Sequence, residues 1–247
     1  MTLAATDVNS RPSPQAVAAG VRSHLSTTAS PALREILATA FLERIEIFAS
    51  LLAAWGSKTN LTARPSDPAE IAFHILDCLT PVAECRARRF RQLESKLSSK
   101  SLVLDLGSGA GFPGLVLAAA YPAYFVLAEA RRKRASFLTV AAAEMKLKNV
   151  EVWQTNVAKT SLTPKFDLVT AKAFGDPETL YTFAAAGLKV GGLALFYAGP
   201  NQSLKKDKAA SRGLTVALEL RYTLGGKAER VERTAVLWRK LSATSEN

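Results

Sequence analysis

The stretch DLGSGAGFPG, residues 105–114, decides the fold of this chain. It overlaps the end of the strand-like run SLVLDL, residues 101–106, and contains four glycines in ten residues. A glycine turn between a strand and a helix lets the backbone approach a bound cofactor at the helix N-terminus. The stretch therefore predicts the first strand, loop and helix of a cofactor-binding α/β sheet.

Two registers of these glycines predict two different cofactors. Gly109, Gly111 and Gly114 satisfy the G-x-G-x-x-G spacing of dinucleotide sites. The register that begins at Gly107, two residues after Asp105, reads D-x-G-x-G-x-G, a spacing typical of methyltransferases that bind S-adenosylmethionine. The loop alone does not decide between the two cofactors.

Residues outside the glycine turn favour the second register. Asp105 lies at the strand end, where its carboxylate can accept N–H bonds from the loop, and a dinucleotide strand usually has an apolar residue there. The segments 166–174 and 188–197 resemble the fourth and fifth strands of methyltransferases. Glu129 ends the second strand, YFVLAE, and can accept hydrogen bonds from both ribose hydroxyls of an adenosine. The predicted cofactor is therefore S-adenosylmethionine. Gly114 is then expected to allow close packing of the helix and not to contact a phosphate.

The composition indicates a globular protein with an anionic partner. The 247 residues suffice for one α/β domain with a modest extension, and 48% of them are hydrophobic. The formal net charge of +11 attracts polyanions, so nucleic acid is the leading partner and an anionic membrane surface comes second. Basic residues gather at 86–91, 131–134 and 205–208.

Nothing in the sequence predicts a metal site, secretion or a membrane span. Cys78 and Cys85 have no zinc-ligand spacing, so we expect inert thiols in a cytoplasmic protein. The first thirty residues lack the apolar core of a signal peptide. Residues 106–128 carry no charge, but four glycines and two prolines interrupt that run.

Apolar spacing divides the chain into three parts. Residues 1–30, rich in Ala, Ser, Thr and Pro, are expected to form a disordered tail. Residues 31–98 are expected to be a helical appendage, with one long helix from Pro31 to Gly56 and a second that begins at Asp67. Residues 99–247 are expected to be the catalytic domain. Its expected strands are 101–106, 123–129, 150–154, 166–171, 192–198, 215–222 and 234–239.

These strands predict a Rossmann-like α/β fold of the class I S-adenosylmethionine-dependent methyltransferases. The seven-stranded sheet should be mostly parallel, because its early strands alternate with helices. The last two strands should pair antiparallel across a turn near Gly225 and Gly226. An N-terminal helical extension completes the predicted architecture.

Several segments resemble the glucose-inhibited division protein B family from about residue 31 to the C-terminus. They are W-x-x-x-x-N-L-T at 55–62, HILDC at 74–78, the glycine loop, RRKRASFL at 131–138 and KAF at 172–174. Members of that family are bacterial methyltransferases that modify N7 of a guanine in small-subunit ribosomal RNA. The resemblance implies the following cofactor contacts: Gly107, Gly109, Phe112, Glu129, Val157, Ala158 and Lys172.

The chain departs from the family pattern at cationic positions. Asn156 and Lys172 stand where the family usually has Arg, and Ala198 stands where it usually has Lys. Gly56 and Phe73 replace the usual Asn and Arg. Lysine keeps the charge at 172 but loses the bidentate guanidinium fork.

The chemistry implied by the resemblance needs no general base, because guanine N7 carries an in-plane lone pair and no proton. Rate then comes from orientation and a preorganised site. The resemblance covers five candidate substrate contacts: Lys172, Arg233, Asn60, His74 and Asp77. We expect Lys172 and Arg233 to bind phosphate. For His74 and Asp77 a structural role that joins the appendage to the catalytic domain is favoured over catalysis, and Asn60 is expected to fix its loop.

The sequence thus predicts an RNA-methylating enzyme of the cytoplasm that acts as a monomer on 16S ribosomal RNA or the small ribosomal subunit, without a membrane partner. Two alternatives remain open. One is a methyltransferase of the same fold that acts on another RNA or a small molecule. The other is a non-catalytic RNA-binding or ribosome-assembly protein, whose affinity would fall with salt. A dehydrogenase is more distant.

Overall fold

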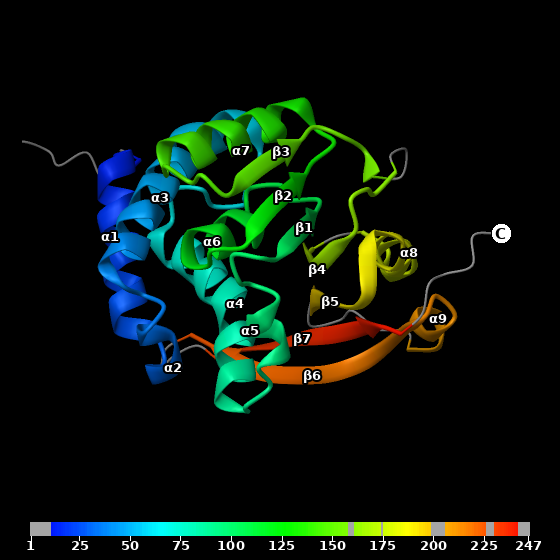
Figure 1. Cartoon of the computed structure of the whole chain (residues 1–247). Helices are drawn as coiled ribbons and strands as arrows, with labels where there is room; N and C mark the ends of the chain where they lie inside the picture. Colours follow the sequence, from blue (N-terminus) through cyan, green and yellow to red (C-terminus); the bar gives the residue numbers. More distant parts are fainter. Residues whose placement is uncertain (1–10, 158–160, 174, 199–205, 226–229, 242–247) are drawn as a thin grey trace, which may run out of the picture.

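A computed structural model describes residues 11–157, 161–173, 175–198, 206–225 and 230–241 (Figure 1). The described residues form a seven-stranded sheet of order β3-β2-β1-β4-β5-β7-β6. The strands are β1 (Leu102–Leu106), β2 (Tyr124–Ala128), β3 (Val150–Trp153), β4 (Phe166–Lys172), β5 (Leu188–Ala198), β6 (Leu214–Leu224) and β7 (Val231–Lys240). The expected strands are confirmed, although β5 begins four residues earlier than the expected start at 192.

Strand direction follows the predicted pattern. The first five strands pair in parallel, whereas β7 runs antiparallel to both β5 and β6. The expected antiparallel pairing of the last two strands is therefore confirmed, and of their expected turn Gly226 lies outside the described residues. Strand order reverses between β1 and β4, where Asp105 is in register with Thr170. Ligands of such sheets bind at this switch point, beyond the carboxyl ends of the strands.

Helices cover both faces of the sheet (Figure 1). Successive strand residues point to opposite faces, so Val103 belongs to one hydrophobic cluster and Leu104 to the other. The first cluster packs beneath α3 (Thr39–Thr59), α4 (Pro68–Ala87), α6 (Gly114–Ala120) and α7 (Arg132–Glu144). The second packs beneath α8 (Pro177–Gly187), with α9 (Lys206–Ala210) beside it. The short helix α5 (Gln92–Ser95) follows α4.

The expected disordered tail is corrected for residues 14–28, which form helix α1 (Pro14–Thr28). Ser13 caps this helix by accepting a hydrogen bond from Ala16 N at 3.2 Å. Val17, Val21 and Leu25 recur at helical spacing and are completely buried against α3 and α4. The apolar stripe is short and diluted by Ala, Ser and Thr, which is why composition alone indicated a tail. Residues 1–10 lie outside the described residues.

The single long helix expected from Pro31 to Gly56 is also corrected, because the chain turns between two helices. Helix α2 (Pro31–Arg34) ends in a tight turn in which Ile36 N donates to Leu33 O at 2.9 Å. Ala38 is extended, and α3 begins at the next residue. The turn lets α2 pack on α4 while α3 packs on α1.

The helical segment and the sheet share one core. Phe48 of α3 lies in the same hydrophobic cluster as Phe112 of the glycine loop and Phe137 of α7. Asp67 caps α4, as its start signal predicted, by accepting from Ala69 N at 2.9 Å. Within the described ranges, no helix combines the length and apolar character needed to cross a lipid bilayer.

Candidate functional site

The glycine loop leaves β1 at Leu106 and turns sharply toward β2. Gly107, Gly109 and Gly111 have φ values of 66°, 55° and 95°, a region that strains residues with a side chain. The N–H groups of Gly107 and Ser108 both donate to the carbonyl of Ala128, at 2.9 and 3.1 Å. The loop is therefore fastened to the carboxyl end of β2, as a cofactor loop at the switch point requires.

Asp105 fixes the loop from below, as its position at the strand end predicted. Its side chain is completely buried, and Oδ2 accepts from Gly114 N at 3.2 Å. Oδ1 accepts from the Thr170 hydroxyl at 2.7 Å. Burial raises the pKa of Asp105 to about 6 although both hydrogen bonds act in the opposite direction.

Gly114 is a packing residue, as the sequence predicted, and the third glycine of a dinucleotide register would have the same role. A Cβ at Gly114 would lie 2.4 Å from Leu127 Cδ2 and 2.6 Å from Asp105 Oδ2. Helix α6 can start so close to β1 and β2 only because this position has no side chain.

Glu129 follows β2 and has an exposed fraction of 6%. Its Oε2 accepts from Gly109 N at 3.0 Å, and its Oε1 accepts from Arg131 N at 2.8 Å. Each carboxylate oxygen keeps a further lone pair. An oriented carboxylate beside a cradle of positive-φ glycines fits the ribose hydroxyls of S-adenosylmethionine.

Two further expected cofactor residues lie near this edge of the sheet. Phe112 is buried in edge-on contact with Phe48, and its ring centroid lies 5.3 Å from that of His74. Val157, after β3, is buried in the second hydrophobic cluster together with Leu106. Ala158 lies outside the described residues.

Asp77 brings together side chains from four elements. The carboxylate has an exposed fraction of 1% and accepts from the Tyr222 hydroxyl of β6 at 2.8 Å. Arg233 of β7 donates to Asp77 Oδ2 at 3.0 Å, and Lys172 Nζ at the end of β4 lies 3.3 Å from the same oxygen. Burial raises the pKa of Asp77, but Lys172 and Arg233 outweigh burial and hold it below its ordinary value. These contacts fit the favoured structural role, because they tie α4 to the sheet.

His74 lies beside the same cations. Its Nδ1 is 3.4 Å from Lys172 Nζ, and because an ammonium only donates, Nδ1 accepts and the ring proton is on Nε2. Nε2 points toward Glu70 Oε1 at 3.8 Å. Burial and the charge of Lys172 lower the pKa of His74 to about 4. The imidazole is therefore neutral at physiological pH.

Lys172 and Arg233, the expected phosphate contacts, are held on one carboxylate. Their side chains are 10% and 18% exposed. The guanidinium of Arg233 also lies 5.4 Å from the centre of the Phe73 ring. Two cations against one carboxylate leave this cluster with a net positive charge, so phosphate contact by either residue remains a prediction.

Asn60 is joined to the catalytic domain through its backbone, so a role of its side chain in fixing the loop stays a prediction. Asn60 ends α3 in the left-handed conformation, with φ 47° and ψ 52°. Its carbonyl accepts from the Arg134 guanidinium at 2.9 Å. Arg134 Nη1 is also 3.8 Å from the Cβ position of Gly109, so the Asn60 loop and the cofactor loop are neighbours.

Sequence reasoning did not single out Thr170, Tyr222 or Arg134 for these contacts. Thr170 carried a usable signal, since its hydroxyl stands within the apolar run of β4. Tyr222 and Arg134 carried none, because each stands next to other polar residues. The departure at Gly56 has a steric reason: a Cβ there would lie 2.1 Å from the Cβ of Pro65.

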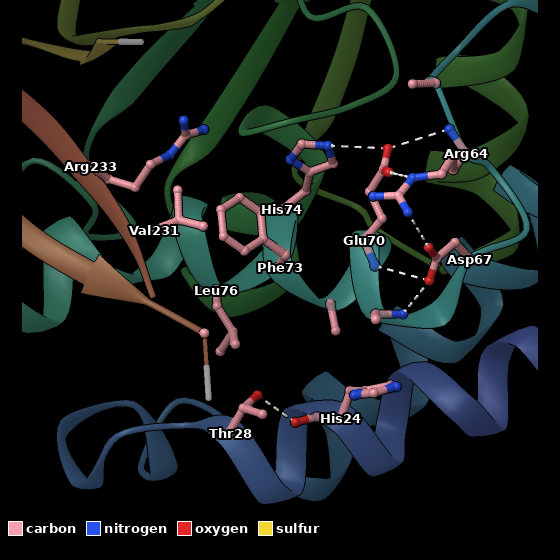
Figure 2. Close-up of a pocket in the computed structure, with 14 residues that line it drawn as sticks. His24, Thr28, Arg64, Asp67, Glu70, Phe73, His74, Leu76, Val231 and Arg233 are labelled. Carbon is pink, nitrogen blue, oxygen red and sulfur yellow. Dashed lines mark hydrogen bonds and ion pairs between the residues drawn. The ribbon is translucent and has the colours of Figure 1, made fainter. Parts of the chain in front are cut away.

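A pocket of about 710 Å³ opens next to the Asp77 cluster (Figure 2). It lies between the C-terminal end of α1, the segment before α4, α4 itself and the adjoining ends of β6 and β7. His74 and Arg233 belong to both the pocket wall and the cluster. Phe73 lines the pocket, and its ring points toward Val231 and Arg233 (Figure 2).

The sheet order, the glycine loop after β1 and the acid after β2 define a class of enzyme, the Rossmann-like methyltransferases that use S-adenosylmethionine. The fold of a solved methyltransferase from Pyrococcus furiosus is similar, with a TM-score of 0.50 at 16% identity. That similarity covers 63% of this chain and 83% of the solved chain.

Sequence comparisons identify the family within this class. The model of the GidB family, described as rRNA small subunit methyltransferase G, matches residues 41–224. A protein named Ribosomal RNA small subunit methyltransferase G from Acidiphilium cryptum is 38% identical over 169 residues, which are 67% of this chain and 72% of that protein. One of the same name from Pseudothermotoga lettingae is 30% identical over 211 residues, 83% of this chain and 85% of that protein. The chain belongs to the GidB family, which confirms the resemblance found in its motifs.

Proposed function

We propose that this enzyme transfers the methyl group of S-adenosylmethionine to N7 of a guanine in 16S ribosomal RNA. The observation that carries the proposal is that the cofactor loop adjoins a positively charged cluster through the contact of Phe112 with His74. The names of the relatives supply the RNA class. The protein works as a cytoplasmic monomer that meets the ribosomal RNA or the small subunit there.

The donor site is formed by residues that would hold the cofactor without taking part in bond making. Glu129 would accept from the ribose hydroxyls, and the loop from Gly107 to Phe112 would enclose the methionine end. S-adenosylmethionine supplies an electrophilic methyl group on its sulfonium sulfur. Orientation and exclusion of water then account for the rate, since N7 has no proton to lose.

The acceptor side must supply positive charge for RNA without directing it at the reacting base. Methylation leaves the guanine ring positively charged, so a free cation against the ring would oppose the reaction. Asp77 draws Lys172 and Arg233 onto one carboxylate, and His74 beside them is neutral at physiological pH. The cluster can thus attract phosphate, while Asp77 partly offsets the charge of its two cations.

The test is methyl transfer from labelled S-adenosylmethionine to small subunits from cells that lack their own enzyme, and to naked 16S RNA in parallel. We expect label in 7-methylguanosine after digestion to nucleosides. Binding of S-adenosylhomocysteine without any label in RNA would contradict the proposal and favour a non-catalytic binding protein. Label in another nucleotide or in a small-molecule fraction would favour a different acceptor.

A further inference from the structure

The pocket of about 710 Å³ lies on the acceptor side of the predicted donor site. Its wall includes His74, whose ring contacts Phe112 of the glycine loop. Its wall also includes Arg233, which shares Asp77 with Lys172 at the end of β4. The pocket therefore adjoins the glycine loop through the contact between His74 and Phe112.

The size and chemistry of the pocket suit one nucleotide. Pockets for small ligands range from about 300 to 1,000 Å³, so the volume is sufficient. Phe73 is partly exposed and projects into the pocket, with the Arg233 guanidinium 5.4 Å from its ring centre (Figure 2). Unstacked RNA bases are held by stacking on aromatic rings or guanidinium planes, and phosphates by cations. Both kinds of contact are available on this wall.

We propose that this pocket receives the acceptor base after it turns out of the RNA, and that the Phe73 ring is the surface on which the base stacks. An enzyme that acts on a base within folded RNA must remove that base from its stack and hold it in a pocket. The inference rests on the proposed function, because it requires RNA as the acceptor. It adds to that function the residue that holds the base, Phe73.

Substitutions at Phe73 separate stacking from packing. Phe73→Leu keeps an apolar side chain in the core contact but removes the ring, whereas Phe73→Tyr keeps the ring. We expect Phe73→Leu to lower kcat/KM for the small subunit by roughly 5- to 150-fold, mainly through a higher KM, which is the range of one lost base stack. Phe73→Tyr should stay within about threefold of the native enzyme, a smaller change than one lost stack. Phe90→Leu is the matched control, since Phe90 is also partly buried but does not line the pocket.

A second pair of variants does not touch the core. Ala63 is exposed at the pocket wall, so Ala63→Trp fills the pocket from outside. Ala210→Trp places the same side chain on exposed α9, away from the pocket. We expect only Ala63→Trp to impair methylation of the subunit, with unchanged affinity for S-adenosylhomocysteine in both variants.

Each result has a definite meaning. Equal kinetics for Phe73→Leu and Phe90→Leu, in a native enzyme that methylates RNA, would overturn the role of Phe73. Normal kinetics for Ala63→Trp would overturn the pocket as the acceptor site. A native enzyme that binds S-adenosylhomocysteine but methylates no RNA would refute the proposed function itself, and this inference with it.

Discussion

The carboxylate of Asp105 and the hydroxyl of Thr170 join the ends of β1 and β4 by a 2.7 Å hydrogen bond beneath the glycine loop. The same carboxylate holds the first N–H of α6, so one buried group connects two strands and a helix at the switch point. Loss of the Asp105 carboxylate should therefore affect both the stability of the protein and cofactor binding.

We expect a distinctive pH dependence from Asp105. Its pKa of about 6 is above the ordinary value of 3.8, so between these pH values the folded protein keeps a proton that the unfolded chain has lost. This contribution to stability is complete below pH 4 and is lost as pH rises through 6, an effect on the order of 3 kcal/mol. The difference in unfolding free energy between the native enzyme and Asp105→Asn, measured in urea from pH 4 to 7, should shrink accordingly. A difference that is constant with pH would contradict the raised pKa.

Glu129→Gln should weaken cofactor binding. The two carboxylate oxygens accept from Gly109 N and Arg131 N, and an amide has only one accepting oxygen. One backbone donor then loses its partner in the free protein, and one ribose hydroxyl loses its acceptor in the complex. Loss of the ribose contact should cost about 1–3 kcal/mol, or roughly 5- to 150-fold in affinity. Calorimetric titration with S-adenosylhomocysteine measures the change. Glu151→Gln on neighbouring β3 is the control, because Glu151 is exposed; equal affinities for the two variants would remove Glu129 from the site.

Asp77→Asn should destabilise the enzyme more than Tyr222→Phe does. Removal of one partner from a buried ion pair costs about 3–5 kcal/mol, because Lys172 and Arg233 would be left without their counter-charge. Loss of the single Tyr222 hydroxyl bond should cost about 1 kcal/mol. Chemical unfolding at pH 7 compares the two. If the asparagine variant is as stable as the native enzyme, the cluster does not join α4 to the sheet as described.

His74 should titrate far below an ordinary histidine. Burial and Lys172 lower its pKa to about 4, so its NMR signals should stay at the neutral position from pH 8 down to about 5. The chain has two histidines, and His24→Gln assigns the remaining signal. A midpoint near 6.5 would mean that the ring is exposed or unpaired in solution. Methylation rates should likewise show no inflection from His74 between pH 6 and 8.

The sheet and the donor loop were predictable because patterns of neighbouring residues determine both. The apolar runs mark the strands within a few residues, and the spacing of Asp105 from the glycines selected the loop register before the contacts of Asp105 and Gly114 were known. Glu129 was identifiable for the same reason, since it ends a strand.

Local sequence patterns could not predict the contacts between segments that are distant in the chain. His74, Asp77, Lys172 and Arg233 were all candidates. That Lys172 and Arg233 meet at the Asp77 carboxylate, with His74 beside Lys172, depends on how α4 packs against the sheet. Helix α1 was missed because a few small apolar residues among Ala and Ser give a weak periodic signal. The pocket was missed with it, because α1 supplies part of its wall.

The position of α1 has a consequence for how this enzyme can change. The region that the family model matches, residues 41–224, contains the glycine loop and Glu129, but His24 and Thr28 of α1 and Arg233 of β7 lie outside it. The residues expected to hold the methyl donor thus lie in the matched region, together with Phe73 and His74 of the pocket wall, and the two flanks of the chain complete that wall. Substitutions at exposed flank residues such as His24 can therefore alter part of the pocket wall without changing a residue of the glycine loop or Glu129.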